Sequence, residues 1–267
     1  YDRAQYWFLT QKKRATLTIG IGAFNGSRLQ ELAPLSWWML QGMTSDQQVI
    51  KVSLAQDYVI KKQEAVGRYD PRLLRGAGVW RDGEDIVIND GRRIVTRTGQ
   101  RIEYAEFPTK AVYLSSDTTF SDLSGDASTR EEGWALMDLI GVQNWAKKSS
   151  ALAVLGWSLI APFGGILKWR PHIWITGRKG TGKSWVVENL VDVLLGDFAY
   201  TGTSEITAAS LRRKLGTDAR SVRLDEMESK DKKTADKISA LLVLERNSSN
   251  DASGYASVCA TAGGTID

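Results

Sequence analysis

The chain has 267 residues and a formal net charge of +4, with 42% hydrophobic and 25% charged residues, which is ordinary for a globular protein. Its single cysteine, Cys259, excludes an intramolecular disulfide framework, and its single histidine, His172, excludes the usual Cys/His zinc sites. The basic surplus lies in residues 1–110, with 17 basic and 12 acidic side chains, and fits either a polyanionic partner or a solvated basic face.

Residues 1–114 are predicted to form a small mixed α/β domain. A helix is expected over residues 44–66, where Ser45 and Gln48 resemble a capping box and apolar residues recur at every fourth position. Short apolar segments follow between residues 79 and 104, separated by the turn dipeptides Asp82-Gly83, Asp90-Gly91 and Thr98-Gly99. This spacing predicts a small antiparallel meander.

Residues 115–128 are rich in Ser, Asp and Thr and are predicted to be a linker. Residues 129–171 are predicted to be a helical connector, with a capping box of Thr129 and Glu132 opening a first helix that extends to about Lys147. The uncharged segment 149–167 approaches the ~18–20 residues that span a bilayer, but a proline and two glycines interrupt it. We therefore expect a buried helix over residues 149–161 and no membrane contact.

The chain begins at Tyr1 and shows no basic and then apolar leader with a small-residue cleavage site. We therefore expect an excised fragment without an export signal. The single cysteine suits a reducing, cytoplasmic location.

The strongest motif follows a predicted strand over residues 172–176 and matches G-x-x-x-x-G-K-[ST] in full. Together with the next residue, Trp185, it supplies the predicted nucleotide-binding residues, which are Gly177, Arg178, Lys179, Gly180, Thr181, Gly182, Lys183 and Ser184. Its glycines allow a tight turn whose N–H groups cradle phosphates at the start of a helix. Lys183 is expected to reach the β- and γ-phosphates of ATP, and the Ser184 hydroxyl to bind Mg²⁺.

A second motif, Ser221 to Glu226, is a short β-prone segment that ends in two acids. We predict that Asp225 helps to hold Mg²⁺ and that Glu226 polarises the attacking water. Arg223 is unusual inside such a strand, because a central parallel strand is normally apolar on both faces. Either it reaches a partner at the end of the strand, or this face is less buried than usual.

Asp225 lies 41 positions after Ser184, which leaves room for a strand near residues 198–201 and a short helix around 207–215. A further helix is expected over 234–245. This is a compact α/β NTPase core, over residues 172–267, of the type with an additional strand and a catalytic glutamate. We expect this core to be cut short at its C-terminus.

These residues resemble a known family. The segments GRKGTGKS, LDEME and RNSSNDASG, with the run from Glu205 to Arg220, are similar to the helicase modules of phage and mobile-element primase-helicases. Those modules are P-loop ATPases related to superfamily 3 and AAA+ proteins. The segment Arg75–Gly91 is similar to the small domain that precedes the ATPase core in such proteins.

The resemblance covers residues 68–265 and implies a homo-oligomeric ring, expected to be a hexamer, that hydrolyses ATP with Mg²⁺ while moving along single-stranded DNA. It assigns catalysis to Lys183 and Glu226 and the metal to Ser184 and Asp225. It also makes a primase module in the same chain an expected partner, and the host cytoplasm the expected location. No arginine can be assigned as the finger that acts on a neighbouring subunit.

Some segments, and the function itself, fit more than one interpretation. Residues 246–250 are either a DNA-contacting loop or a solvated turn, and Thr261 is either a sensor residue or part of a loop. An ATP-driven DNA-binding switch or loader without unwinding activity is the alternative function, and a structural assembly module with residual nucleotide binding is a third.

Overall fold

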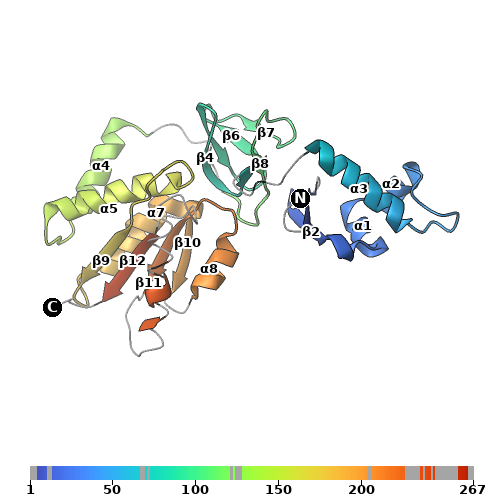
Figure 1. Cartoon of the computed structure of the whole chain (residues 1–267). Helices are drawn as coiled ribbons and strands as arrows, with labels where there is room; N and C mark the ends of the chain where they lie inside the picture. The colour runs from blue at the N-terminus through green and yellow to red at the C-terminus, as the bar shows by residue number, and fades with distance from the viewer. Residues whose placement is uncertain are drawn as a thin grey trace. The chain divides into compact units, whose positions relative to one another are not determined.

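The computed structural model describes residues 5–10, 14–66, 70, 73–120, 123, 128–203, 206–225, 235–236, 238–241, 243 and 258–263. It divides into two compact units, Tyr1–Leu74 and Arg75–Asp267. The division falls between Leu74 and Arg75, whereas the composition predicts a linker over residues 115–128. Figure 1 shows the elements of both units along the chain.

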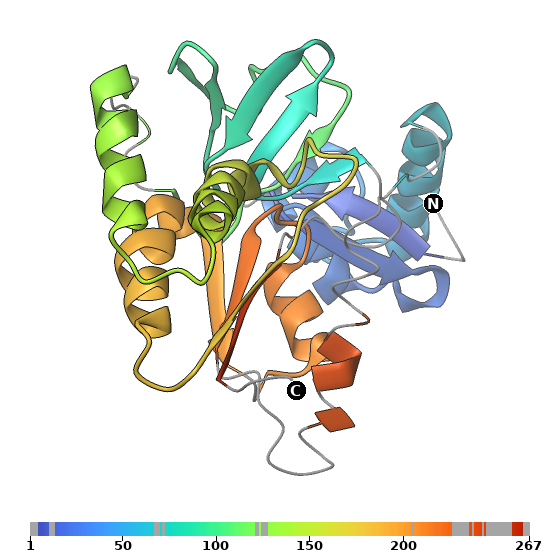
Figure 2. The ribbon, with the colours of Figure 1, turned by 90° about the vertical axis from the view of Figure 1, so that its left-hand side faces the viewer.

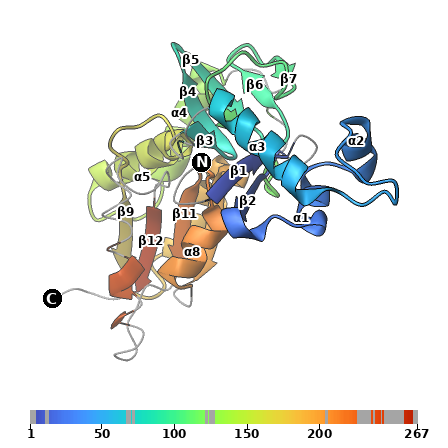
Figure 3. The same cartoon turned by 45° about the vertical axis from the view of Figure 1, so that its right-hand side comes forward.

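The first unit combines a hairpin with three helices (Figure 3). Its elements are β1 (Gln5–Leu9), β2 (Thr16–Gly20), α1 (Gly26–Leu32), α2 (Leu35–Leu40) and α3 (Val52–Val66). Strands β1 and β2 pair antiparallel. The Trp38 indole is buried and donates hydrogen bonds to the carbonyls of Leu29 and Ala33, at 3.1 and 3.0 Å, which ties α2 to the end of α1.

The predicted helix over residues 44–66 is correct only from Val52 onward. Residues before it form a turn in which Thr44 and Ile50 make a β-bridge and the Ser45 hydroxyl accepts the Val49 N–H at 3.3 Å. Gln48 has a φ of +59°, a left-handed conformation that a right-handed helix does not contain. The serine therefore stabilises a turn in competition with the helix that its spacing from Gln48 suggests.

The second unit begins with the predicted meander, which is confirmed. Its strands, in the antiparallel order β4-β5-β6-β7, are β4 (Gly78–Asp82), β5 (Asp85–Asn89), β6 (Ile94–Thr96) and β7 (Arg101–Ile102). The short strands β3 (Leu74–Arg75) and β8 (Val112–Tyr113) pair beside it. Trp80, Val87, Ile94 and Tyr113 form its core.

The rest of the second unit is built on a parallel four-stranded sheet in the order β10-β11-β12-β9. The strands are β9 (Ile173–Gly177), β10 (Ala199–Thr203), β11 (Ser221–Asp225) and β12 (Val258–Gly263). Strand β12 therefore lies between β9 and β11, although it comes last in the chain. Because all four strands are parallel, their carboxyl ends lie at one edge of the sheet.

Helices cover both faces of this sheet (Figure 2). One face is covered by α4 (Arg130–Gly141), α5 (Lys148–Ile160) and a continuous helical segment of α6 (Lys183–Val186), a π-helical stretch (Val187–Val191) and α7 (Asp192–Leu195). The other face is covered by α8 (Ala208–Leu215). Residues 235–236, 238–241 and 243 are helical, within the span predicted for the last helix.

The helices of the connector, α4 and α5, begin close to their predicted first residues. The capping box is present, because the Thr129 hydroxyl accepts the Glu132 N–H at 3.2 Å and the Glu132 carboxylate accepts the Thr129 N–H at 2.7 Å. Helix α4 ends at Gly141, so its predicted continuation to about Lys147 is wrong. None of the helices in the described part of the chain has the length and apolar character needed to cross a bilayer.

The meander is fastened to the parallel sheet by the turn that leads into β11. Asp218 is 9% exposed and accepts hydrogen bonds from the Ala77 N–H at 2.8 Å and the Ser116 hydroxyl at 2.9 Å. Arg220 donates to the Thr118 hydroxyl at 2.9 Å, and Phe120 stacks on Phe198. The described start of the segment predicted as a linker, up to Phe120, is thus packed and hydrogen-bonded within the second unit.

We expect Asp218→Ala to destabilise the fold by about 2 kcal/mol, because it leaves the buried Ala77 N–H without an acceptor. Burial raises the pKa of Asp218 above 3.8, against the opposing effect of its hydrogen bonds. The folded state then holds this proton more tightly than the unfolded chain, so the contribution of Asp218 to stability is largest at low pH and is lost as pH rises through the raised pKa.

Asp218→Asn, which does not titrate, should therefore gain stability relative to the wild type as pH rises from about 4. Urea unfolding of the wild type and both variants between acid and neutral pH measures these effects. The control is Asp85→Ala, at an exposed position of β5, which should change stability by less than about 0.5 kcal/mol. Equal stability of Asp218→Ala and the wild type would contradict the role of Asp218 as a fastening.

Candidate functional site

The glycine-rich loop 177–184 joins the carboxyl end of β9 to the start of α6, as predicted. Gly180 and Gly182 have φ of +78° and +86°, left-handed conformations that favour glycine. Gly182 is the N-cap of α6. The loop therefore turns sharply at two glycines and delivers the chain into a helix whose first N–H groups have no partner within the helix.

The side chain of Lys183 is folded back over this loop. Its ammonium donates hydrogen bonds to the carbonyl oxygens of Gly177 at 2.6 Å and Arg178 at 3.1 Å. The Thr181 hydroxyl donates to the same Arg178 carbonyl at 2.8 Å. The ammonium is thus held against the loop, and a cation beside a glycine-rich turn at the start of a helix favours the binding of a phosphate.

A cavity of about 550 Å³ adjoins the loop. Its walls come from the loop between α4 and α5, the start of α5, strand β9 and the glycine-rich loop, and among the residues that line it are Gln143, Trp145, Ser150, Val154, Ile175, Gly182 and Lys183. This volume lies within the ~300–1,000 Å³ of ordinary small-molecule sites. The sequence offered no signal for the contribution of residues 143–146, which depends on α4 ending at Gly141.

Asp225 ends β11 at the carboxyl edge of the sheet. In the sheet register Leu224 lies opposite Ala260 of β12, and Gly263 of the same strand lies opposite Gly177. Asp225 and the glycine-rich loop therefore emerge at the same edge, separated by one strand. This is where parallel sheets bind ligands.

Arg223 is 7% exposed and reaches two carboxylates. Its guanidinium lies 3.4 Å from Asp192, on the helix after the glycine-rich loop, and 3.7 Å from Asp225. Of the two explanations for an arginine in this strand, the one in which it finds a partner at the strand's end is correct. Burial raises the pKa of Asp192, and Arg223 lowers it in part.

The described structure brings most of the predicted site residues into one region. The residues from Gly177 to Ser184 form one loop, Trp185 follows it at 41% exposure, and Asp225 lies at the same sheet edge. Glu226 and residues 246–250 lie outside the described residues. Thr261 belongs to β12, but its side chain is not among those described.

The donors of this region suit Mg²⁺, a hard cation that takes oxygen ligands and commonly shares one or two protein groups with substrate phosphates. Ser184 and Asp225 offer a hydroxyl and a carboxylate. Among the described residues, no three His, Cys, Asp or Glu side chains gather into a metal site. An ion held here would therefore need further ligands from a nucleotide or water.

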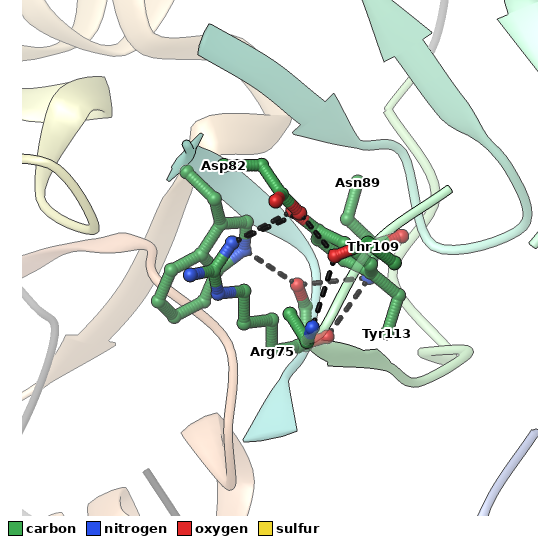
Figure 4. Close-up of polar contacts among 8 residues, drawn as sticks. Arg75, Asp82, Asn89, Thr109 and Tyr113 are labelled. Carbon is green, nitrogen blue, oxygen red and sulfur yellow. Dashed lines mark hydrogen bonds and ion pairs between the residues drawn. The ribbon is translucent and has the colours of Figure 1, made fainter. Parts of the chain in front are cut away.

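A polar cluster in the meander was not predicted (Figure 4). The Asp82 carboxylate accepts hydrogen bonds from Thr109 at 2.5 Å, Tyr113 at 2.8 Å and Arg75 at 3.3 Å. Burial raises the pKa of Tyr113, which therefore stays protonated as a donor. Since the donors and the acceptor satisfy one another, we interpret the cluster as a structural link between β3, β4 and β8. No motif or spacing in the sequence connects these distant residues.

Comparisons with known proteins give little further guidance. No family model matches the chain. No curated protein matches it either. Among solved structures, it is similar to the apo structure of the C-terminal region of NrS-1, with a TM-score of 0.32 and 16% identity, covering 70% of this chain. The chain spans 54% of that structure.

Proposed function

We propose that this chain is the ATP-dependent DNA helicase module of a phage or mobile-element replication protein. The observation that carries the proposal is the glycine-rich loop, which has the full G-x-x-x-x-G-K-S sequence and joins a parallel strand to a helix with the Lys183 ammonium folded over it. This combination supports nucleotide phosphate binding.

Four side chains have distinct roles in the proposed site. Lys183 exchanges its two carbonyl partners for the β- and γ-phosphates of ATP. Ser184 and Asp225 hold Mg²⁺, which offsets the charge of the phosphates when it is bound. Glu226 accepts the proton of the attacking water as general base. The cavity beside Gly182 has room for the rest of the nucleotide.

The strand order supports an ATPase core with an additional strand and a catalytic glutamate. Strand β12 separates the strand of the glycine-rich loop, β9, from the strand that ends in Asp225. The helicase activity, the hexameric ring, the single-stranded DNA and the primase module in the same chain rest on the family resemblance of residues 68–265. They are part of the proposal on that basis.

The test is an assay of ATP hydrolysis and strand displacement by the purified protein, with and without single-stranded DNA. We expect single-stranded DNA to stimulate hydrolysis and a tailed duplex to be unwound. A preparation of Lys183→Ala, assayed in parallel, controls for contaminating helicases. Stimulation without displacement would contradict unwinding and favour the DNA-binding switch or loader. Complete insensitivity to DNA would favour a structural assembly module.

A further inference from the structure

Arg223 is a buried cation shared between two carboxylates of different kinds. Asp225, 3.7 Å away, is the proposed metal ligand, whereas Asp192, 3.4 Å away, lies eight residues after Ser184 on the following helix. Glu188 and Asp225 both raise the pKa of Asp192 by their charge, and the charge of Arg223 offsets this effect in part. The guanidinium therefore forms ion pairs with both Asp192 and Asp225.

Neither ion pair makes all the close contacts that its charged groups allow. Both distances exceed the ~2.7–2.9 Å of direct charge-assisted hydrogen bonds. Among the described residues, the Nε of Arg223 and the Oδ1 of Asp192 are also buried without a hydrogen-bond partner. A guanidinium has five N–H donors and pairs best in a two-bond fork with a single carboxylate. Arg223 therefore holds an intermediate position from which it can pair more closely with either acid.

We propose that Arg223 is an internal counter-ion that competes with Mg²⁺ for Asp225, and that Asp192 is the acceptor to which it transfers when the metal binds. This inference rests on the proposed function. Without metal, Arg223 offsets the charge of Asp225 and keeps its carboxylate in place. With Asp225 engaged by a divalent cation, the Arg223 guanidinium would pair fully with Asp192. Arg223 and Asp192 are thus positioning residues with opposite effects on metal affinity.

The test is a double-mutant cycle read by metal binding without turnover. The probe is Mn²⁺ alone, which takes oxygen ligands as Mg²⁺ does and whose free form is measured by electron paramagnetic resonance. We expect Arg223→Met to bind Mn²⁺ about threefold to tenfold more tightly, and Asp192→Asn to bind it more weakly by a similar factor. Because Asp192 acts through Arg223, Asp192→Asn should have no effect in the Arg223→Met background.

If Asp192→Asn weakens Mn²⁺ binding equally in the wild-type and the Arg223→Met backgrounds, the inference is overturned, because Asp192 would then act through its own charge. Weaker binding by Arg223→Met would also overturn it. The Asp192 side chain is 32% exposed, so Asp192→Asn tests the inference even if Arg223→Met does not fold, and wild-type affinity in that variant would contradict it.

Two control variants distinguish a failure of this inference from a failure of the proposed metal site. Arg220→Met removes a nearby cation that bonds to Thr118 and to the carbonyls of Asp197 and Ala199, and should leave Mn²⁺ affinity unchanged. Asp225→Asn should abolish Mn²⁺ binding. If Asp225→Asn binds Mn²⁺ as the wild type does, the proposed metal site itself is wrong. If it does not bind, the results of the cycle bear on Arg223 and Asp192 alone.

Discussion

Lys183→Ala should abolish Mg²⁺-dependent ATP hydrolysis, with a loss of about 10²-fold to 10³-fold or more in kcat/KM. The ammonium is the one side-chain cation that lies on the carbonyls of Gly177 and Arg178 within the described loop. Alanine removes that charge while leaving the backbone turn at Gly180 and Gly182 in place. Phosphate release from ATP with Mg²⁺ measures the effect.

The fold should survive this substitution, because among the described residues Lys183 hydrogen-bonds to its own loop alone, and it lies outside the buried core. Thermal unfolding of the variant checks this. The matched control is Lys168→Ala, an exposed lysine before β9, which should hydrolyse ATP at the wild-type rate. A folded Lys183→Ala protein that retains hydrolysis would show that the glycine-rich loop is not the phosphate site.

Glu226→Gln should bind ATP with near-normal affinity and turn it over about 10²-fold to 10³-fold more slowly. The residue follows Asp225 directly in the sequence, and Asp225 lies at the sheet edge that carries the glycine-rich loop. An amide keeps the size of the carboxylate but does not accept the proton of the attacking water. Equilibrium binding of a fluorescent ATP analogue and single-turnover hydrolysis separate the two effects.

The control for Glu226→Gln is Glu84→Gln, the same chemical change at an exposed turn of the meander, which should leave both binding and turnover unchanged. Near-normal turnover by Glu226→Gln would place the general base at another residue. Loss of ATP binding along with turnover would instead assign Glu226 to nucleotide or metal binding.

The features that the sequence predicted best depend on near neighbours. The capping box of Thr129 and Glu132 spans four residues, and the turns at Gly83, Gly91 and Gly99 need only a positive φ at one position. The glycine-rich loop is of the same kind, because its eight consecutive residues carry both the turn and the cation. Local backbone geometry is enough to fix such features.

Local patterns failed where a second local structure competed. Ser45 and Gln48 have the spacing of a capping box, yet the serine stabilises a turn and the helix begins at Val52. Helix α4 ends at Gly141 and not near Lys147, which frees residues 143–146 to line the cavity beside the glycine-rich loop. Helix ends depend on packing partners that the period of apolar residues does not reveal.

By itself, the sequence determined the glycine-rich loop between a strand and a helix and the position of Asp225 at the end of β11, since each follows from residues close together in the chain. Only the tertiary structure decided that Arg223 forms an ion pair with Asp192 and that Asp218 accepts a hydrogen bond from Ala77, 141 residues away. It also decided that the start of the predicted linker is packed. The physical reason is that such contacts form when separate apolar surfaces are buried together, and buried polar groups must then find partners that the fold brings within reach.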